Sequence, residues 1–241
     1  MNSTDPSVNT FGAYFANCVN LKNLYNAKGE AFNFVSNGIA WNKFKINPSL
    51  SKMFLNCKSL TNDTISAFIG ENKIYGPEEN DYDRGEFDYY ELIAADEMFS
   101  GCTELNKLIV RFNNVGKLKT LSKFAYNCKN VTTGNITVYD SEVLTDLSYL
   151  FAQSSEDNQG ALTDFDLSIY YKDSSVKNSG LQTVTTLEGL LSNCINLTAL
   201  DMSTWNVSGL KTIKAMCYNN KNLKTIILAD SYTFNLLEIA D

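Results

Sequence analysis

The chain has 241 residues, a net charge of −7 and a hydrophobic fraction of 44%, which is enough apolar material for a substantial core. It contains no run of Lys or Arg, so it lacks the basic footprint that nucleic-acid binding requires, and its acidity disfavours anionic membranes. No apolar run approaches the ~18 residues of a membrane span, and the first residues do not read as a signal peptide. We therefore expect no nucleic-acid partner and no membrane insertion.

One short pattern recurs along the chain, and each copy is anchored on one position that is usually a cysteine. Apolar residues come at every third position before the anchor and at alternate positions after it. The first spacing predicts one or two turns of helix, and the second predicts a short strand. The best-preserved copies lie between Thr186 and Leu228 and are offset by about 26 residues. In chain order the anchors are Cys18, Cys57, Cys102, Cys128, Ser154, Cys194 and Asn220.

No copy can bury its apolar side alone, so stacking is expected to join the copies into one repeat domain over residues 1–241. This reading predicts an α/β solenoid of about seven coils, each with a short strand and a short helix, and a parallel sheet on one face. Neighbouring anchors would lie a whole coil apart, whereas a disulfide needs Cα atoms within ~7 Å. We therefore expect the anchor cysteines to be free, buried and structural.

Three insertions interrupt the pattern, and the second, residues 71–91, is rich in both acidic and aromatic residues. Clustered carboxylates suit calcium, but the EF-hand spacing is missing, so a solvated acidic loop is the preferred interpretation and no metal site is expected. Exposed aromatic residues are enriched at interfaces, which makes four side chains of this loop candidates for partner binding. They are Tyr82, Phe87, Tyr89 and Tyr90. The other insertions lie at 27–47 and, in two parts, at 155–160 and 172–182.

The strand positions that alternate with the core should face a common, concave surface, which repeat proteins use for binding. Many of these positions face only water in such proteins, and exposed apolar residues such as Ile109 favour a protein contact. The candidates for partner binding on this surface are Lys107, Ile109, Arg111, Asp164, Asp166 and Tyr170.

Catalytic equipment is sparse in this sequence. The chain has no His, which excludes Ser-His-Asp and Cys-His catalysis and every metal site that contains His. It also has no Cys-x-x-Cys pair and no glycine-rich phosphate motif. We expect no enzyme activity and no cofactor. A carbohydrate-active enzyme that uses a carboxylate pair remains an alternative, because 27 Asp and Glu residues are available, although the sequence singles out no pair.

The phrases KMFLNCKSL, EMFSGCTEL and LLSNCINL, together with ALDMSTWNVSGL from Ala199 to Leu210, resemble the repeat of BspA-like leucine-rich-repeat surface proteins. The resemblance implies a right-handed solenoid of the leucine-rich-repeat type. It also implies a non-enzymatic recognition or adhesion scaffold on a cell surface or in the extracellular space. Its partner would be a protein or a cell-surface glycan. Phages also carry such repeats, so a virion structural or host-attachment protein on the exterior of the particle, assembled with other subunits, remains an alternative.

Overall fold

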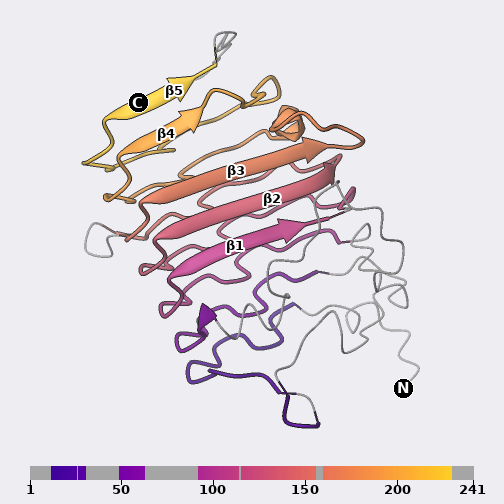
Figure 1. The fold of residues 1–241 in the computed structure, drawn as a ribbon, viewed down its shortest axis with the longest axis vertical. Helices are drawn as coiled ribbons and strands as arrows, with labels where there is room; N and C mark the ends of the chain where they lie inside the picture. Colours follow the sequence, from indigo (N-terminus) through magenta and orange to yellow (C-terminus); the bar gives the residue numbers. More distant parts are fainter. Residues whose placement is uncertain are drawn as a thin grey trace.

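The computed structural model describes residues 12–25, 27–30, 49–62, 92–113, 115–155 and 160–229. Its strands form two parallel sheets, one of three strands and one of two, and they follow one another along the long axis of the molecule (Figure 1). The elements with described bounds are β1 (Lys107–Phe112), β2 (Thr133–Ser141), β3 (Asp164–Tyr171), the 3₁₀ helix η3 (Ser179–Thr183), β4 (Ala199–Met202) and β5 (Thr225–Leu228).

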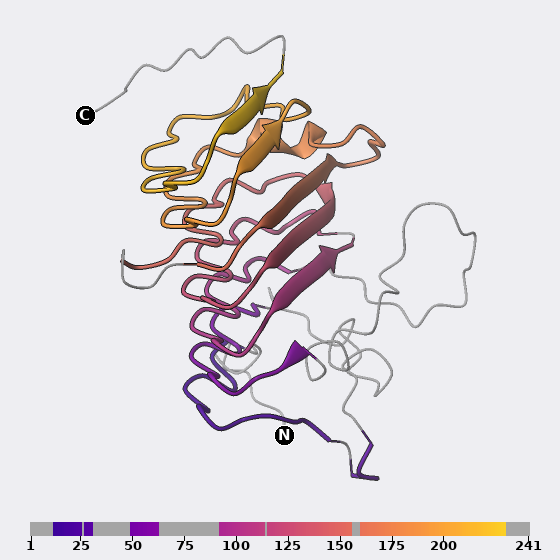
Figure 2. The same cartoon turned by 60° about the vertical axis from the view of Figure 1, so that its left-hand side comes forward.

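The expected right-handed leucine-rich-repeat-type solenoid of about seven coils, each with a strand and a helix, is wrong. The stretches before the anchors are turns in the described residues, and only two small sheets stand where one continuous parallel sheet was predicted. Figure 2 shows the strands along one side of the molecule and narrow loops along the other. We call these loops the turn segments; they comprise residues 12–17, 51–56, 96–101, 122–127, 148–151, 188–193 and 214–219.

Left-handed backbone conformations explain why the turn segments are not helices. Nearly every turn segment has positive φ at the residue before its anchor, as at Asn127 (59°) and Asn193 (62°). A second positive φ falls four residues earlier, as at Lys123 (55°) and Gly189 (61°). A left-handed residue breaks a right-handed helix, and its cost to a residue with a Cβ is about 1–2 kcal/mol. The apolar period of three therefore reflects short turns separated by left-handed residues.

Backbone hydrogen bonds hold the turn segments in a row. In each one, alternate N–H groups donate to carbonyl groups of the next; Gly189 donates to Lys214 and Leu191 to Met216, at 2.9 and 2.8 Å. Parallel bridges accompany these bonds and link Ser49, Ala94, Thr120, Asp146, Thr186 and Thr212 in succession. Where no insertion intervenes, equivalent positions are 26 residues apart, as are the hydrogen-bonded hydroxyls of Ser122 and Ser148. The donors between segments all point toward the C-terminal end, so the row has a direction.

A single apolar core lies between the strands and the turn segments. Phe15, Phe54, Phe99 and Phe124 form an aromatic column in it, with ring centroids 5.4, 5.6 and 5.3 Å apart. Phe54, Phe99 and Phe124 are fully buried. Burying one such ring stabilises the fold by roughly 2–3 kcal/mol through the hydrophobic effect alone. The column therefore joins successive turn segments through side chains as well as through the backbone.

The anchor cysteines line the same core, and all six cysteines of the chain are free thiols. Cys57, Cys102, Cys128 and Cys194 are buried as expected, but Cys18 is exposed because it follows the first turn segment of the row. The buried thiols donate to a carbonyl of the preceding turn segment; Cys128 Sγ, for example, lies 2.9 Å from the Phe99 oxygen. These thiols act as small core residues that also satisfy backbone acceptors.

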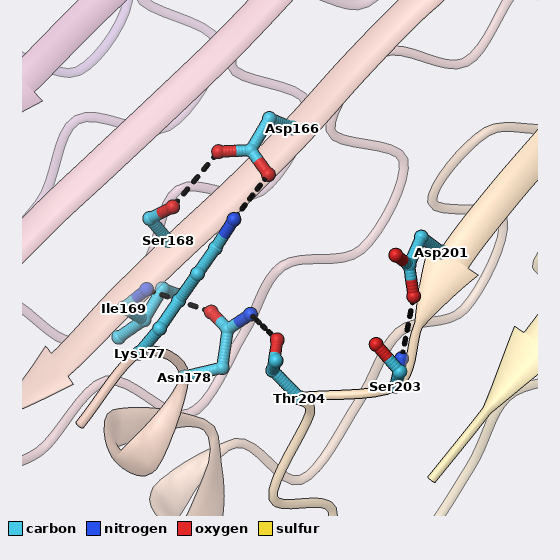
Figure 3. A network of polar contacts seen from close by, with 8 residues as sticks. All are labelled: Asp166, Ser168, Ile169, Lys177, Asn178, Asp201, Ser203 and Thr204. Atoms are coloured by element: carbon cyan, nitrogen blue, oxygen red, sulfur yellow. Dashed lines mark hydrogen bonds and ion pairs between the residues drawn. The ribbon is translucent and has the colours of Figure 1, made fainter.

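The insertion after β3 divides the predicted single sheet into two. The Ile169 N–H, on the edge of β3, donates to Asn178 Oδ1 at 2.9 Å, and the Tyr171 N–H donates to Ser179 Oγ at 3.0 Å (Figure 3). Side chains of the insertion thus take the hydrogen bonds that a neighbouring strand would take. These bonds close the C-terminal part of the β3 edge, and β4 pairs with β5.

Candidate functional site

The outward side of the three-stranded sheet is the candidate site, and we call it the sheet face. Burial alternates along β1, where Leu108, Val110 and Phe112 point into the core. The same alternation in β2 and the parallel register of the three strands bring the outward residues into rows. The sheet face consists of Lys107, Ile109, Arg111, Thr133, Asn135, Thr137, Tyr139, Asp164, Asp166, Ser168 and Tyr170.

The middle row of the sheet face combines three different chemical groups. Ile109, Asn135 and Asp166 are register partners on β1, β2 and β3. The Ile109 side chain is 49% exposed, although it is apolar. Asn135 Oδ1 is buried and has no hydrogen-bond partner among the described residues. An unsatisfied buried polar group costs roughly 1–3 kcal/mol, so its presence calls for an explanation beyond folding.

The charges of the sheet face are separated by strand. The cationic side chains Lys107 and Arg111 stand on β1, whereas the carboxylates Asp164 and Asp166 stand on β3. Between them, β2 contributes neutral polar residues such as Thr133. A surface with this arrangement has a basic border and an acidic border, which orients a charged partner.

The insertion between β3 and β4 supplies a cation to the acidic border (Figure 3). Lys177 Nζ lies 2.7 Å from Asp166 Oδ1, and Ser168 Oγ donates to Asp166 Oδ2 at 2.8 Å. Both charged side chains of this ion pair are more than 40% exposed, so the pair contributes only about 0–1 kcal/mol to stability. Its main effect is to fix the Asp166 carboxylate in one orientation.

Asn178 anchors the same insertion beneath the ion pair. Its backbone is left-handed, with φ of 63°, and the residue is fully buried. Besides accepting from Ile169, its Nδ2 donates to Thr204 Oγ1 at 3.0 Å, which ties the insertion to the turn after β4 (Figure 3). In that turn Asp201 Oδ1 accepts the Ser203 N–H at 2.8 Å, and hydrogen bonds from Ser203 lower the pKa of the exposed Asp201 carboxyl.

An aromatic pair lies at the end of the sheet face. The rings of Tyr139 and Tyr170 are stacked, with centroids 4.8 Å apart and planes 11° from parallel. Both residues are half-buried and belong to adjacent strands, β2 and β3. Such pairs prefer an offset arrangement and are worth about 0.5–1.5 kcal/mol beyond their burial. The pair gives the sheet face a rigid aromatic edge.

The sequence-predicted binding residues fall into two groups. Lys107, Ile109, Arg111, Asp164, Asp166 and Tyr170 come together on the sheet face. The other four, Tyr82, Phe87, Tyr89 and Tyr90, lie outside the described residues, as does the whole acidic insertion 71–91. Whether any of these side chains contacts a partner stays a prediction.

The sequence analysis did not identify the residues that β2 and the insertion after β3 contribute to the candidate site. Tyr139 and Asn135 could have been found, because the inward positions Ile136 and Val138 fix which residues of β2 face outward. Lys177 and Asn178 carry no such signal, since their partners are 11 and 9 residues away in an irregular loop.

Two kinds of feature are absent from the described residues. Within these ranges no group of three or more Cys, Asp or Glu side chains is placed to hold a metal ion. In the same residues, no helix is both long and apolar enough to cross a bilayer.

One comparison with known proteins gives a match. The model of the family described as "Mycoplasma protein of unknown function, DUF285" matches residues 66–175 and 161–236, which together span most of the chain. Neither the curated proteins nor the solved structures give a significant match.

Proposed function

This chain belongs to the DUF285 family, and we propose that it is a non-enzymatic recognition scaffold on a cell surface that binds a protein partner through the sheet face. The family is associated with BspA-like surface repeat proteins, whose repeat the sequence resembles. Surface repeat proteins present broad, rigid faces to their partners, which is the property that the sheet face offers.

The observation that carries the proposal is the middle row of the sheet face. Ile109 is half-exposed on β1, an edge strand of the sheet, in a row whose other side chains, Asn135 and Asp166, are polar or charged. Beside it, Asn135 Oδ1 is buried and has no hydrogen-bond partner among the described residues, so a donor from a partner could satisfy it. An exposed apolar side chain beside polar ones is a combination that protein–protein interfaces use.

The separated charges favour a protein over a glycan as the partner. A protein can present acidic groups to Lys107 and Arg111 and basic groups to Asp164 in a single orientation. A neutral glycan gains nothing from such a charge pattern. Asp166 contributes less to this complementarity because Lys177 already neutralises it.

The test is the binding of the purified chain to cultured epithelial cells, measured by flow cytometry with and without prior treatment of the cells. Trypsin treatment of the cells removes protein partners, and glycosidase treatment removes glycans. We expect trypsin to abolish binding, glycosidases to leave it, and Ile109→Asp to weaken it at least about tenfold, the equivalent of about 1.4 kcal/mol.

Val143→Asp is the matched control, because Val143 is also an exposed apolar residue (39%) but lies outside the sheet face. Its binding should equal that of the unaltered chain. Equal binding by Ile109→Asp and the unaltered chain would refute the role of the sheet face. Loss of binding after glycosidase treatment but not after trypsin would replace the protein partner by a glycan.

A further inference from the structure

The last turn segment of the row, residues 214–219, presents backbone donors that have no acceptors. The N–H groups of Gly189 and Asn193, in the segment before it, donate to carbonyl groups of this segment. The donors at the equivalent positions one repeat later include the N–H groups of Ala215 and Asn219, and no described residue accepts from either. A row of unpaired backbone groups is a template for pairing with another chain.

The first turn segment, residues 12–17, presents the complementary acceptors at the opposite end of the molecule (Figure 1). Each donor of the row pairs with the carbonyl group just before its own counterpart in the next segment, as Gly189 does with Lys214. The carbonyl groups that this rule selects in the first segment include those of Gly12 and Ala16. Neither of them accepts a hydrogen bond within the described part of the chain. One end of the row therefore offers donors, and the other offers acceptors at the same spacing.

The asparagine side chains at the left-handed positions show a second complementarity between the two ends. Asn219 Nδ2 donates to Asn193 Oδ1 at 2.8 Å. Asn56 Nδ2 donates to Asn17 Oδ1 at 3.0 Å, so in both pairs the later asparagine is the donor. In the described ranges Asn219 Oδ1 accepts no hydrogen bond, and Asn17 Nδ2 donates none. An Asn17 side chain placed after Asn219 would continue the same pattern.

The apolar core is incompletely covered at both ends of the row. Leu190 is fully buried, whereas its counterpart one repeat later, Met216, is only partly buried. On the strand side of the same end, Ile226 of β5 is 45% exposed, although its register partner on β4 is buried. At the other end Phe15 is only partly buried, whereas Phe54 beside it in the aromatic column is fully buried. Contact between the two ends would remove apolar surface from water on both sides.

We infer that the two ends of the row bind each other in different copies of the chain, so that the protein assembles head to tail. The Ala215 N–H of one copy donates to the Gly12 carbonyl of the next. The Asn219 N–H likewise donates to the Ala16 carbonyl, and Asn219 Oδ1 accepts from Asn17. This contact goes beyond the proposed function and does not depend on it, because the sheet face lies along the side of the molecule between the two ends (Figure 2).

The direction of the donors excludes a symmetric dimer at either end. Two copies joined through the segment 214–219 would place donors against donors, and two copies joined through the segment 12–17 would place acceptors against acceptors. A contact between unlike ends leaves one donor end and one acceptor end free on every assembly. It therefore continues to add copies unless the rotation between neighbours closes a ring.

Two variants block one end each. In Asn17→Asp the carboxylate still accepts from Asn56, but it has no donor for Asn219 of the neighbouring copy. Met216→Asp places a charge in the apolar contact at the other end. Sedimentation velocity across the micromolar range should show a mass that rises with concentration for the unaltered chain. Each variant alone should stay monomeric, with association weakened at least about tenfold. An equimolar mixture should form a dimer and nothing larger, because each variant keeps one functional end.

Met216→Leu is the matched control, because it keeps an apolar side chain of similar volume and should assemble like the unaltered chain. Cys102 must stay unreactive to iodoacetamide in every variant, which shows that the core is intact. An unaltered chain that stays monomeric throughout, or a mixture that forms no dimer, would overturn the inference. Assembly of either variant on its own would also overturn it, because the contact would then join like ends.

The thiol of Cys18 gives a measurement that needs no variant. Cys18 is exposed because it follows the first turn segment, whereas Cys57, Cys102, Cys128 and Cys194 are buried against a preceding segment. Head-to-tail assembly places the segment 214–219 of another copy in that preceding position. The iodoacetamide modification rate of Cys18, followed by mass spectrometry, should fall at least about tenfold between dilute and concentrated protein. A rate that is independent of concentration would contradict the assembly.

Discussion

The Asn178 side chain accepts the backbone N–H of Ile169, a residue in the C-terminal half of β3, at a distance of 2.9 Å. This hydrogen bond takes the place of a strand–strand bond, and with the bond from Tyr171 to Ser179 it closes the C-terminal part of the β3 edge. It also places the insertion that carries Lys177 beside the sheet face. The same insertion therefore closes part of the sheet edge and adds a cation to the candidate site.

Two substitutions of Asn178 should distinguish the stability that comes from its side-chain hydrogen bonds from the stability that depends on its left-handed backbone. Asn178→Gly keeps the left-handed conformation but leaves the Ile169 N–H unpaired, which should cost about 1–3 kcal/mol. Asn178→Ala adds the strain of a left-handed residue with a Cβ, a further ~1–2 kcal/mol. Urea unfolding measures both values. Equal stability of Asn178→Gly and the unaltered chain would show that the bond to Ile169 contributes nothing.

Gly101 should resist substitution for two separable reasons. Its φ is +75°, and an added Cβ would lie 2.3 Å from Asn56 Oδ1 in the neighbouring turn segment. Gly29 has φ of +79° with no atom within 4 Å of such a Cβ. We expect Gly29→Ala to cost about 1 kcal/mol through strain alone, and Gly101→Ala to cost about 1–3 kcal/mol more through the clash. Thermal unfolding of the two variants compares them directly.

The aromatic column should be most sensitive at its centre. Phe99 is fully buried between Phe54 and Phe124, so Phe99→Ala leaves a cavity and should cost about 3–5 kcal/mol. Phe15, at the end of the column, is half-buried, and Phe15→Ala should cost clearly less. The comparison is made by urea unfolding. Similar losses of unfolding free energy for both variants would contradict the expectation that the centre of the column contributes most to stability.

Alkaline pH should destabilise the fold through the buried thiols. Burial raises the pKa of Cys128 from 9.0 to about 12, and that of Cys194 likewise to about 12. Above pH 9 the unfolded chain loses these protons while the folded chain keeps them, so the free energy of unfolding falls as the pH rises from 9 toward 12. In that window each thiol lowers the free energy of unfolding by up to about 1.4 kcal/mol per pH unit.

Cys128→Ala tests this linkage, because it removes one titrating thiol from the core. The free energy of unfolding is measured in urea from about pH 8 to about pH 10.5 for both proteins. The variant should be less stable at the lower pH, since it loses a packed side chain and a donor to the Phe99 carbonyl, but its stability should decline less steeply. Parallel curves would exclude Cys128 as a source of the pH dependence.

The sequence predicted the strands better than the segments before them. Alternation in KLIVRF identified which residues of β1 enter the core, because a strand's side chains have a period of two. Apolar residues at every third position fit a helix as well as a series of short turns, so the sequence predicts helices where the turn segments lie. Asn at the position before most of the anchors was the available warning, but Lys52, Glu97 and Lys123 are also left-handed and carry no such signal.

The sequence predicts which residues of the candidate site face away from the core only where they alternate with core residues along a strand. Ile109 and Asp166 were placed correctly relative to the core by alternation, but their alignment with Asn135 depends on the register between the strands. The step from β2 to β3 is longer than the step from β1 to β2 because of an insertion, whose effect on register the sequence does not show. The closure of β3 by Asn178 depends on a loop conformation, which no periodicity predicts.

The common direction of the N–H groups between turn segments also has an electrostatic consequence. Each of these peptide groups carries a dipole, and dipoles that point the same way add rather than cancel. The turn segments therefore carry a net dipole along the row, positive at the segment 214–219 and negative at the segment 12–17, as an α-helix does along its axis. Acidic groups are favoured at the first end and basic groups at the second.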